Sequence, residues 1–194
     1  KVSAEEAAFE LFLKDKPLDD LELFMAEFNA NLPQDIRALS IDEVTSDFNI
    51  IQDSKYKEYH YIFSQGEKCH PFCAPIMTTI LEPLNISMMI KGAALFEGKH
   101  NFKPYCYKAT DKGLYERELL CCELLENKLY TANFFPEKSY ILSVIGKGFG
   151  RHQIRLMMGA LVKLGRGEVD LDYIAKSLTK EFEGIKVKIP DDGY

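Results

Sequence analysis

The sequence predicts an α+β fold, on three observations. Segments with apolar residues at helical spacing are interspersed with segments that alternate between apolar and polar residues, as strands do. The apolar content of the later strand segments is typical of a half-buried antiparallel sheet. The chain has 194 residues, 46% of them hydrophobic and 28% charged, which is enough to bury a sizeable core in one large domain or two small ones.

The N-terminal part predicts one helix followed by one strand. The helix covers residues 20–29, with Asp19 as its N-cap and Pro17 just upstream. It ends before Pro33, because a proline disfavours helical backbone in the residue that precedes it. Its apolar stripe consists of Leu21, Phe24, Met25 and Phe28. Residues 36–44 then predict a strand.

A second strand is predicted at residues 56–64, YKEYHYIFS, where the pattern alternates. One face carries Tyr56, Glu58, His60 and Ile62, and the other carries Lys57, Tyr59, Tyr61 and Phe63. Two interpretations of Tyr59 and Tyr61 are open. Their rings either stack on a nucleobase or pack as core or cross-strand partners.

The other predicted elements follow in the remaining two thirds of the chain. Helices are expected over residues 83–96, 150–164 and 171–178, and strands over residues 115–125 and 139–149. Residues 92–105 end the first of these helices and enter a polar loop that contains Lys99 and His100. Because aromatic residues are interleaved with basic ones, this loop is either a solvated surface or an RNA contact.

Residues 146–167, GKGFGRHQIRLMMGALVKLGRG, form the most informative segment. Two glycines follow a β-prone run and precede an amphipathic helical pattern. One sector of that helix carries Arg151, His152, Arg155 and Lys163, and the opposite sector carries Ile154, Met157, Met158, Leu161 and Leu164. Backbone N–H groups at the start of the helix add positive potential. The pattern indicates an anion site or a seat for a buried carboxylate, with an ordinary solvated helix face as the alternative.

The net charge of −6 is unevenly distributed along the chain. Residues 1–50 carry twelve acidic and four basic residues, a net charge of −8. Residues 101–166 carry eleven basic and six acidic residues, a net charge of +5. The basic segment is compatible with a polyanionic partner such as RNA.

Membrane and metal-dependent classes are disfavoured. No apolar run is long enough to span a bilayer, and the first residues lack the apolar core of a signal peptide, so no membrane partner is expected. The five cysteines, an odd number, then favour reduced thiols and a cytoplasmic location. Cys69, His70 and Cys73 invite a zinc interpretation, but zinc normally needs four ligands, and no second Cys or His pair stands at usable spacing. We therefore expect no metal ion.

Four stretches resemble, in the same order, motifs of the TruA family of tRNA pseudouridine synthases. Residues 29–36, NANLPQDI, are similar to the family's NANLPxDI turn, and residues 57–61, KEYHY, are similar to its K/R-x-Y-x-Y strand. Glu82-Pro-Leu and residues 98–102, GKHNF, are similar to its EPLD and GEHDF segments. Residues 146–167 resemble its GNGFLYHQVRNMVGxLLxVGRG segment.

The resemblance implies a pseudouridine synthase-like fold, with a central antiparallel sheet flanked by helices. Residues 1–55 would be the remainder of an N-terminal subdomain and residues 56–194 the C-terminal catalytic and RNA-binding subdomain. The implied activity is isomerisation of uridine to pseudouridine in RNA, with the tRNA anticodon arm as the expected substrate. No redox cofactor or metal is required for it, and a homodimer is expected because members of this family are commonly homodimers.

The resemblance also implies the site residues. Tyr59 stands at the position of the active-site tyrosine, and Arg155 at that of the arginine that pairs with the catalytic aspartate. We expect the Arg155 guanidinium to face Tyr59 across a cleft that accepts an extruded uracil. The candidate phosphate contacts are Lys99, His100, Lys147, Arg151 and His152.

The chain departs from the family pattern at three places. Lys1-Val-Ser-Ala4 resembles the tail of the family's GRTDxGVxA segment, so the nucleophilic aspartate is expected two residues upstream of Lys1, and the fragment alone is expected to be inactive. Residues 190–194 resemble the approach to the family's last strand and then stop. Ile51 stands where the family usually has an arginine. The alternative hypothesis is a non-catalytic RNA-binding relative without an RTD-like triplet upstream.

Overall fold

The computed structural model describes residues 3–14 and 18–182 of the chain. Lys1, Pro17 and residues 190–194, on which parts of the sequence analysis rest, lie outside the described residues. Within the described ranges, no helix combines the length and the apolar character that crossing a bilayer requires.

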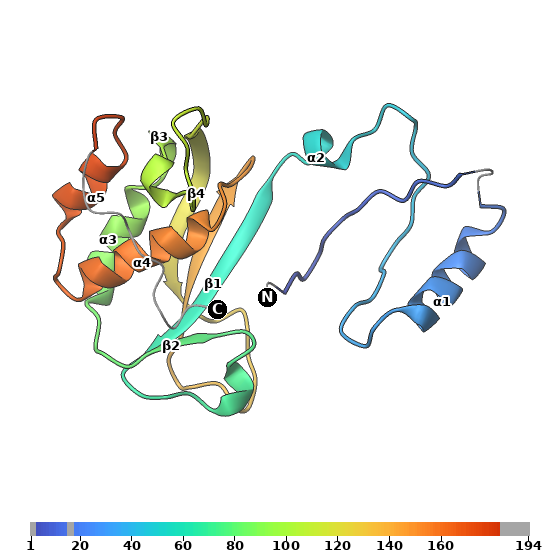
Figure 1. The fold of residues 1–194 in the computed structure, drawn as a ribbon. Coiled ribbons are helices and arrows are strands. Elements are labelled where there is room, and N and C mark those ends of the chain that lie inside the picture. The colour runs from blue at the N-terminus through green and yellow to red at the C-terminus, as the bar shows by residue number, and fades with distance from the viewer. Residues whose placement is uncertain (1–2, 15–17, 183–194) are drawn as a thin grey trace. The chain divides into compact units, whose positions relative to one another are not determined.

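The chain divides into two compact units, which we describe separately. Residues 4–54 form the smaller unit, and the chain from Lys55 onward belongs to the larger one, which contains the whole β-sheet (Figure 1). The assignment of roles to residues 1–55 and 56–194 stays a prediction.

The smaller unit contains the predicted first helix, α1 (Leu21–Asn31). Its N-cap is Asp20 and not Asp19, because the Asp20 carboxylate accepts a hydrogen bond from the Leu23 backbone N–H at 2.9 Å. The helix ends before Pro33, as predicted. None of its residues is fully buried, so its stripe is only partly covered within this unit.

The strand predicted at residues 36–44 is wrong, because this segment is irregular. The Asn29 side chain takes the role that a neighbouring strand would have, donating to the Ala38 carbonyl at 3.1 Å and accepting from the Ala38 N–H at 2.8 Å. A short helix that the sequence analysis missed, α2 (Ile50–Asp53), follows and is capped by the side chain of Asn49.

The larger unit is built on a five-stranded sheet of order β2-β1-β5-β4-β3. The strands are β1 (Lys57–Gln65), β2 (Thr78–Ile80), β3 (Gly98–Asn101), β4 (Glu116–Glu126) and β5 (Tyr140–Gly146). Strands β1, β5, β4 and β3 pair antiparallel, as predicted, while β2 pairs parallel to β1 and makes the sheet mixed. The α+β fold with an antiparallel centre is therefore confirmed.

Two edge strands were not predicted. Residues 98–101 were expected in a loop but form β3, because they pair with β4 along its first half. Strand β2 has only three residues and depends on its pairing with β1. Strands this short carry too little periodicity to be recognised in the sequence.

Three helices accompany the sheet: α3 (Ile86–Ala94), α4 (Gln153–Gly165) and α5 (Leu171–Ser177). Helix α3 is shorter than the predicted 83–96, because Asn85 caps its first turn. Helix α4 begins three residues later than predicted, because His152 has a left-handed backbone, with φ of 58°. Helices α3 and α4 pack against each other and against the sheet (Figure 1).

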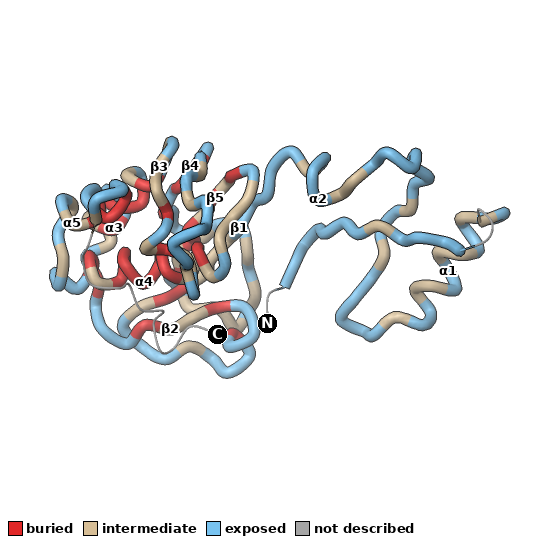
Figure 2. The backbone as a smooth tube through the Cα atoms, turned by 45° about the horizontal axis from the view of Figure 1, so that its top comes forward, coloured by how far each residue is buried: buried red, intermediate tan, exposed pale blue. Residues whose placement is uncertain are grey.

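The core lies between these helices and the sheet, where Figure 2 shows the buried backbone concentrated. The predicted apolar stripe of α4 is confirmed, because Met157, Met158, Leu161 and Leu164 are all buried. On β1 the residue buried from the predicted aromatic face is Phe63, and Tyr61 is partly buried against the core. Tyr59 lies on the same face of β1, near the end of the sheet where β5 leads into the turn before α4.

Candidate active site

Tyr59 is the accessible member of the two strand tyrosines. Tyr61 packs against the core and donates its hydroxyl hydrogen to the Thr78 hydroxyl at 3.0 Å. Tyr59 keeps 38% of its surface exposed and meets the Phe149 ring edge-on, at 5.1 Å between centroids and 83° between planes. Of the two interpretations left open, Tyr61 fits the core role, and Tyr59 has a ring face with one aromatic neighbour and access to solvent.

The contact between Tyr59 and Phe149 follows from the register of the sheet. Tyr59 lies opposite Val144 in the antiparallel pair of β1 and β5. Strand β5 ends at Gly146, and the next residues turn back toward α4. Phe149 stands in that turn, so the ring of Tyr59 lies against the segment that leads into the helix. The sequence analysis missed Phe149, although it precedes the HQ pair in the matched motif.

Arg155 lies in the first turn of α4 and is half-buried. Its guanidinium makes no hydrogen bond or ion pair with any other residue that the structure describes. A partly buried cation without a carboxylate partner is favourable for binding an anion. The pairing of this arginine with a catalytic aspartate, and the cleft between it and Tyr59, remain predictions.

Arg151 and His152 do not lie on the helix as the sequence predicted. They form the turn before α4, because the left-handed His152 interrupts the helical backbone. Both side chains point instead toward Tyr107, a residue that the sequence analysis missed. The His152 ring stacks on it at 5.0 Å, and the Arg151 guanidinium carbon lies 5.2 Å from its ring centroid.

The other candidate phosphate contacts lie in two places. Lys147 is exposed in the turn after β5, close in sequence to Phe149 and Arg151. Lys99 and His100 lie on β3, at the sheet edge, with β4 and β5 between them and β1. The candidates therefore form two groups, of which only the one around the β5–α4 turn lies beside Tyr59.

Lys99 and His100 have both acidic and basic neighbours. His100 Nε2 lies 2.6 Å from the Glu97 carbonyl oxygen, and Lys99 stands opposite Glu118 in the β3–β4 register. Both line a surface pocket of about 350 Å³ that also contains Glu116 and Lys180, whose side chains form an ion pair at 2.7 Å. Because Lys180 compensates Glu116, this pocket remains compatible with an anion.

Cys69, His70 and Cys73 do not gather as a metal site. His70 Nδ1 accepts a hydrogen bond from the Phe72 N–H at 3.2 Å, and the Cys69 thiol lies 2.8 Å from the Ser64 hydroxyl. Burial is the main cause that raises the pKa of the Cys73 thiol. A buried thiol hydrogen-bonded within the protein is typical of a packing cysteine.

Within the described part of the chain, the group of potential ligands that gathers most closely is Glu97, Cys121 and Glu123. The Glu97 carboxylate already accepts the Cys122 backbone N–H at 2.9 Å. Burial, followed by Glu123 and Glu97, raises the pKa of the Cys121 thiol. The group holds a protonated thiol between two carboxylates, and nothing about it indicates a resident ion.

Two of the matched motifs are connected by an ion pair in the structure. The Arg166 guanidinium from the end of the 146–167 segment binds the Glu82 carboxylate at 2.9 Å. A backbone hydrogen bond at Glu82, and then the bond from Arg166, lower the pKa of the Glu82 carboxyl. This pair lies away from Tyr59, so its role is to join the segment before α3 to the end of α4.

The structure thus places a partly exposed strand tyrosine against the turn that leads to the cationic start of α4. Residues 93–190, half of the chain, match the family model described as tRNA pseudouridine synthase. The chain therefore belongs to the tRNA pseudouridine synthase family and to its TruA type, as the four motifs predicted.

Curated relatives extend the match over most of the chain. It is 30% identical over 168 residues to tRNA pseudouridine synthase A 2 of Desulfotalea psychrophila, covering 84% of this chain and 62% of the relative. It is 26% identical over 179 residues to tRNA pseudouridine synthase A of Staphylococcus aureus, covering 90% and 64%. The corresponding protein of Acinetobacter baumannii is 26% identical over 166 residues, covering 85% and 59%. The chain thus spans about three fifths of the length of these relatives.

Proposed function

We propose that the protein isomerises uridine to pseudouridine in tRNA. The observation that carries the proposal is the placement of Tyr59 against the segment that leads to an unpaired Arg155, within a chain that belongs to this family. The relatives named as tRNA pseudouridine synthases support the same reaction. The uridines of the anticodon arm are the expected targets, from the resemblance to the TruA family.

The reaction needs few chemical groups. The N1–C1′ bond breaks and a C5–C1′ bond forms, C5 loses its proton and N1 gains one, so nothing is oxidised and no cofactor is consumed. The enzyme must hold the base outside its stack, place a carboxylate at the sugar or ring, and exclude water. Each of these tasks requires positioning more than added reactivity.

The residues divide these tasks between them in our proposal. Tyr59 stacks on the extruded uracil and acts near the C5 proton, for which its exposed ring is suited. Arg155 holds the nucleophilic aspartate ionised and oriented through a charge-assisted pair. That aspartate is expected upstream of Lys1. Lys147, Arg151 and His152 contact phosphates and position the RNA.

The decisive experiment maps pseudouridine in cellular RNA with and without the gene for the intact protein. Loss of pseudouridine at defined tRNA positions supports the enzyme, and restoration by the intact gene confirms its assignment. Unchanged modification at every position contradicts it. If the maps are unchanged while tRNA still co-purifies with the protein, the non-catalytic RNA-binding alternative is favoured, with exposed Ile51 in place of the family arginine as its structural correlate.

A cytoplasmic location belongs to the same proposal. The relatives are named as tRNA-modifying enzymes, and free tRNA in a bacterial or eukaryotic cell is met chiefly in that compartment or in the nucleus. All five cysteines are free thiols, which is compatible with a reducing environment. Fluorescence of the intact protein fused to a reporter would check the location directly.

A further inference from the structure

We propose that Tyr107 organises a phosphate-binding cluster with Lys108, Arg151 and His152. The cluster holds an RNA backbone phosphate next to the candidate active site, and the proposal rests on the function proposed above. Tyr107 and Lys108 follow β3 in a loop, whereas Arg151 and His152 precede α4. Residues more than forty positions apart therefore converge on one ring.

The contacts around Tyr107 are unusually numerous for an exposed side chain. The His152 ring stacks on it nearly parallel, at 13° and 5.0 Å. The Arg151 guanidinium and the Lys108 ammonium lie 5.2 Å and 5.5 Å from its ring centroid. Both distances are within the range of a cation–π attraction. Tyr107 is 40% exposed, and Lys108 and Arg151 are themselves exposed, so both cations are accessible to a ligand.

These cations have no acidic partner in the described parts of the chain. Neither Lys108 nor Arg151 takes part in an ion pair with a described residue. Asp111 is the acid nearest to Lys108 in sequence, and its carboxylate binds the Lys103 ammonium at 2.8 Å. An uncompensated cluster of this kind attracts a polyanion, and a phosphate oxygen is the ligand that best satisfies both lysine and arginine.

The backbone is strained at the same place. Lys108 and His152, with φ of 55° and 58°, are the two described residues other than glycine that have positive φ. Both are in contact with Tyr107. The left-handed conformation is unfavourable for most L-residues. Residues other than glycine that adopt it are often found at functional sites, where the surrounding structure holds them. Here the strained backbone turns both side chains onto the same ring.

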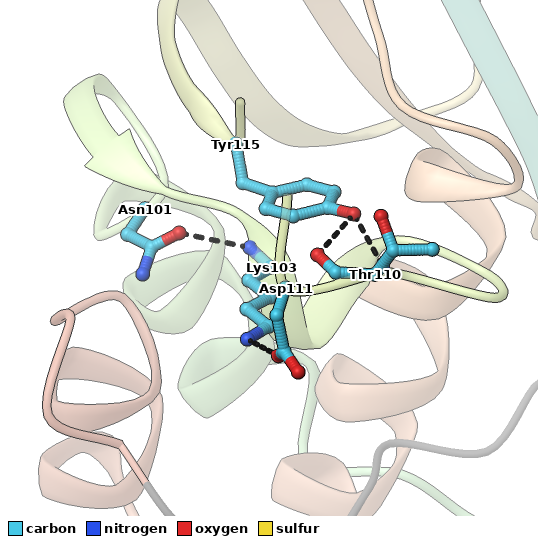
Figure 3. A network of polar contacts seen from close by, with 5 residues as sticks. All are labelled: Asn101, Lys103, Thr110, Asp111 and Tyr115. Atoms are coloured by element: carbon cyan, nitrogen blue, oxygen red, sulfur yellow. Dashed lines mark hydrogen bonds and ion pairs between the residues drawn. The ribbon is translucent and has the colours of Figure 1, made fainter. Parts of the chain in front are cut away.

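The loop that presents Tyr107 is fixed at its base, as Figure 3 shows. The Tyr115 hydroxyl accepts the Thr110 N–H at 2.6 Å and donates to the Thr110 carbonyl at 3.0 Å. Lys103 N–H donates to Asn101 Oδ1 at 3.1 Å. At the other side, the Tyr107 N–H donates to the Arg151 carbonyl at 2.9 Å, which ties the loop to the start of α4. The cluster is therefore preorganised.

A phosphate held here would be close to the reaction centre. Arg151 lies four residues before Arg155 and two after Phe149, which touches Tyr59. Phosphate contacts fix the register of a nucleic acid without selecting its bases. We therefore infer that the cluster positions the strand that delivers the target uridine, and that Tyr107 acts as a positioning residue and not a catalytic one.

The test measures binding of a fluorescently labelled, unmodified tRNA transcript to the intact protein by anisotropy, over a series of salt concentrations. The variants are Tyr107→Leu, Tyr107→Phe, Lys108→Gln and Arg151→Gln. Lys112→Gln is the matched control, because Lys112 is exposed in the same loop and makes no ion pair with a described residue. Circular dichroism of each variant verifies folding.

We expect Lys108→Gln and Arg151→Gln each to lower the slope of log affinity against log salt by roughly 0.7 to 0.9, the value for one lost phosphate contact. Tyr107→Leu should lower the affinity about as much as either of these substitutions does, because loss of the ring releases both cations. Tyr107→Phe keeps the ring and should bind like the unchanged chain, as should Lys112→Gln. Rescue by phenylalanine separates a cation-holding ring from a mere loss of volume or of the hydroxyl.

Three negative results have different meanings. If the unchanged chain binds tRNA and Tyr107→Leu, Lys108→Gln and Arg151→Gln all bind equally well, the cluster proposal is overturned and the proposed function stands. If the intact protein without substitutions fails to bind tRNA at all, the proposed function itself is contradicted, and the cluster proposal fails with it. A Tyr107→Phe variant as weak as Tyr107→Leu would also overturn the role of the ring.

Discussion

Arg155 illustrates how much of the proposed chemistry depends on a single side chain. It lies half-buried in the first turn of α4, near the segment that touches Tyr59, and has no partner among the residues described. A buried cation of this kind is costly unless an anion compensates it. Under the proposed function, the expected anion is a catalytic aspartate, and the expected role of Arg155 is to position that nucleophile.

Replacing Arg155 with alanine in the intact protein should lower pseudouridine formation strongly. Loss of the group that orients a nucleophile costs on the order of a hundredfold in rate. Arg155→Lys should recover only part of the lost activity, because an ammonium cannot form a bidentate pair with a carboxylate. The measurement is tritium release or mass-spectrometric detection of pseudouridine. Lys163→Gln, further along α4, serves as the control, and activity of Arg155→Ala equal to the control would contradict the role.

At the scale of elements, α3 and α4 approach each other so closely that a side chain at one glycine position would force its neighbours to shift. A Cβ added at Gly92 would lie 3.1 Å from Leu161 Cδ2 and still closer to Leu164 Cδ2. Both leucines are fully buried in the core between the helices and the sheet. Gly92 therefore sets the distance between α3 and α4, and with it the position of α4 on the sheet.

Gly92→Ala should destabilise the fold although alanine favours helices. Overpacking costs about 1–3 kcal/mol, while the gain in helix propensity is about 1 kcal/mol, so the net loss is roughly 0–2 kcal/mol. Urea unfolding followed by circular dichroism measures it. Ser87→Ala, on the exposed surface of α3, gains propensity without a clash and should be neutral or slightly stabilising. A Gly92→Ala protein as stable as Ser87→Ala would show that the leucines can move aside.

The loop between β3 and β4 should depend on pH at one ion pair. The hydrogen bond to Lys103 lowers the pKa of the Asp111 carboxyl, and the same bond raises the pKa of the Lys103 ammonium. The stabilisation of the loop by the Asp111 carboxylate is fully present above the ordinary aspartate pKa and disappears as the pH falls through the lowered pKa. The stabilisation by the Lys103 ammonium disappears as the pH rises through the raised pKa of Lys103. Between these two pH values we expect the ion pair to stabilise the loop.

Carbon-13 NMR of the aspartate carboxyls checks this expectation. The titration midpoint of Asp111 should lie below that of a free aspartate, and Lys103→Gln should return it to the ordinary range. Because the Asp111 side chain is almost fully exposed, the effect on global stability should be small. An Asp111 midpoint that does not change on Lys103→Gln would show that the ion pair is not formed in solution.

For the whole molecule, the resemblance to the TruA family predicts a homodimer. Light scattering of the intact protein should give twice the mass of one chain, and the 194-residue chain, of 22.2 kDa, should be tested in parallel. A dimer of both would assign the interface to the residues present here. A monomeric intact protein at micromolar concentration would contradict the prediction. The result matters for function, because a dimer presents two copies of the phosphate cluster to one RNA.

The long, strongly patterned elements were predictable from the sequence. Strand β1, the central strands β4 and β5, and helices α1, α4 and α5 were all expected within a few residues of their bounds. The errors fall where a tertiary contact overrides the local pattern. The Asn29 amide satisfies Ala38 in place of a strand partner, and pairing with β4 turns a polar loop into β3.

The candidate site follows the same division. The order and spacing of four motifs predicted roles for Tyr59 and Arg155, because residue type and chain position are enough to recognise a family. The Phe149 contact and the cluster around Tyr107 could not be predicted, since nothing in the local sequence says that these rings meet residues forty or more positions away.

The sequence by itself determined the family and the fold class, and it predicts the two residues on which the proposed chemistry depends. Only the tertiary structure decided the edges of the sheet, the start of α4 and the residues that contact Tyr107. The physical reason is that periodicity and motif spacing are properties of neighbouring positions, whereas strand pairing, a left-handed residue and a cation over a ring arise from contacts between distant ones.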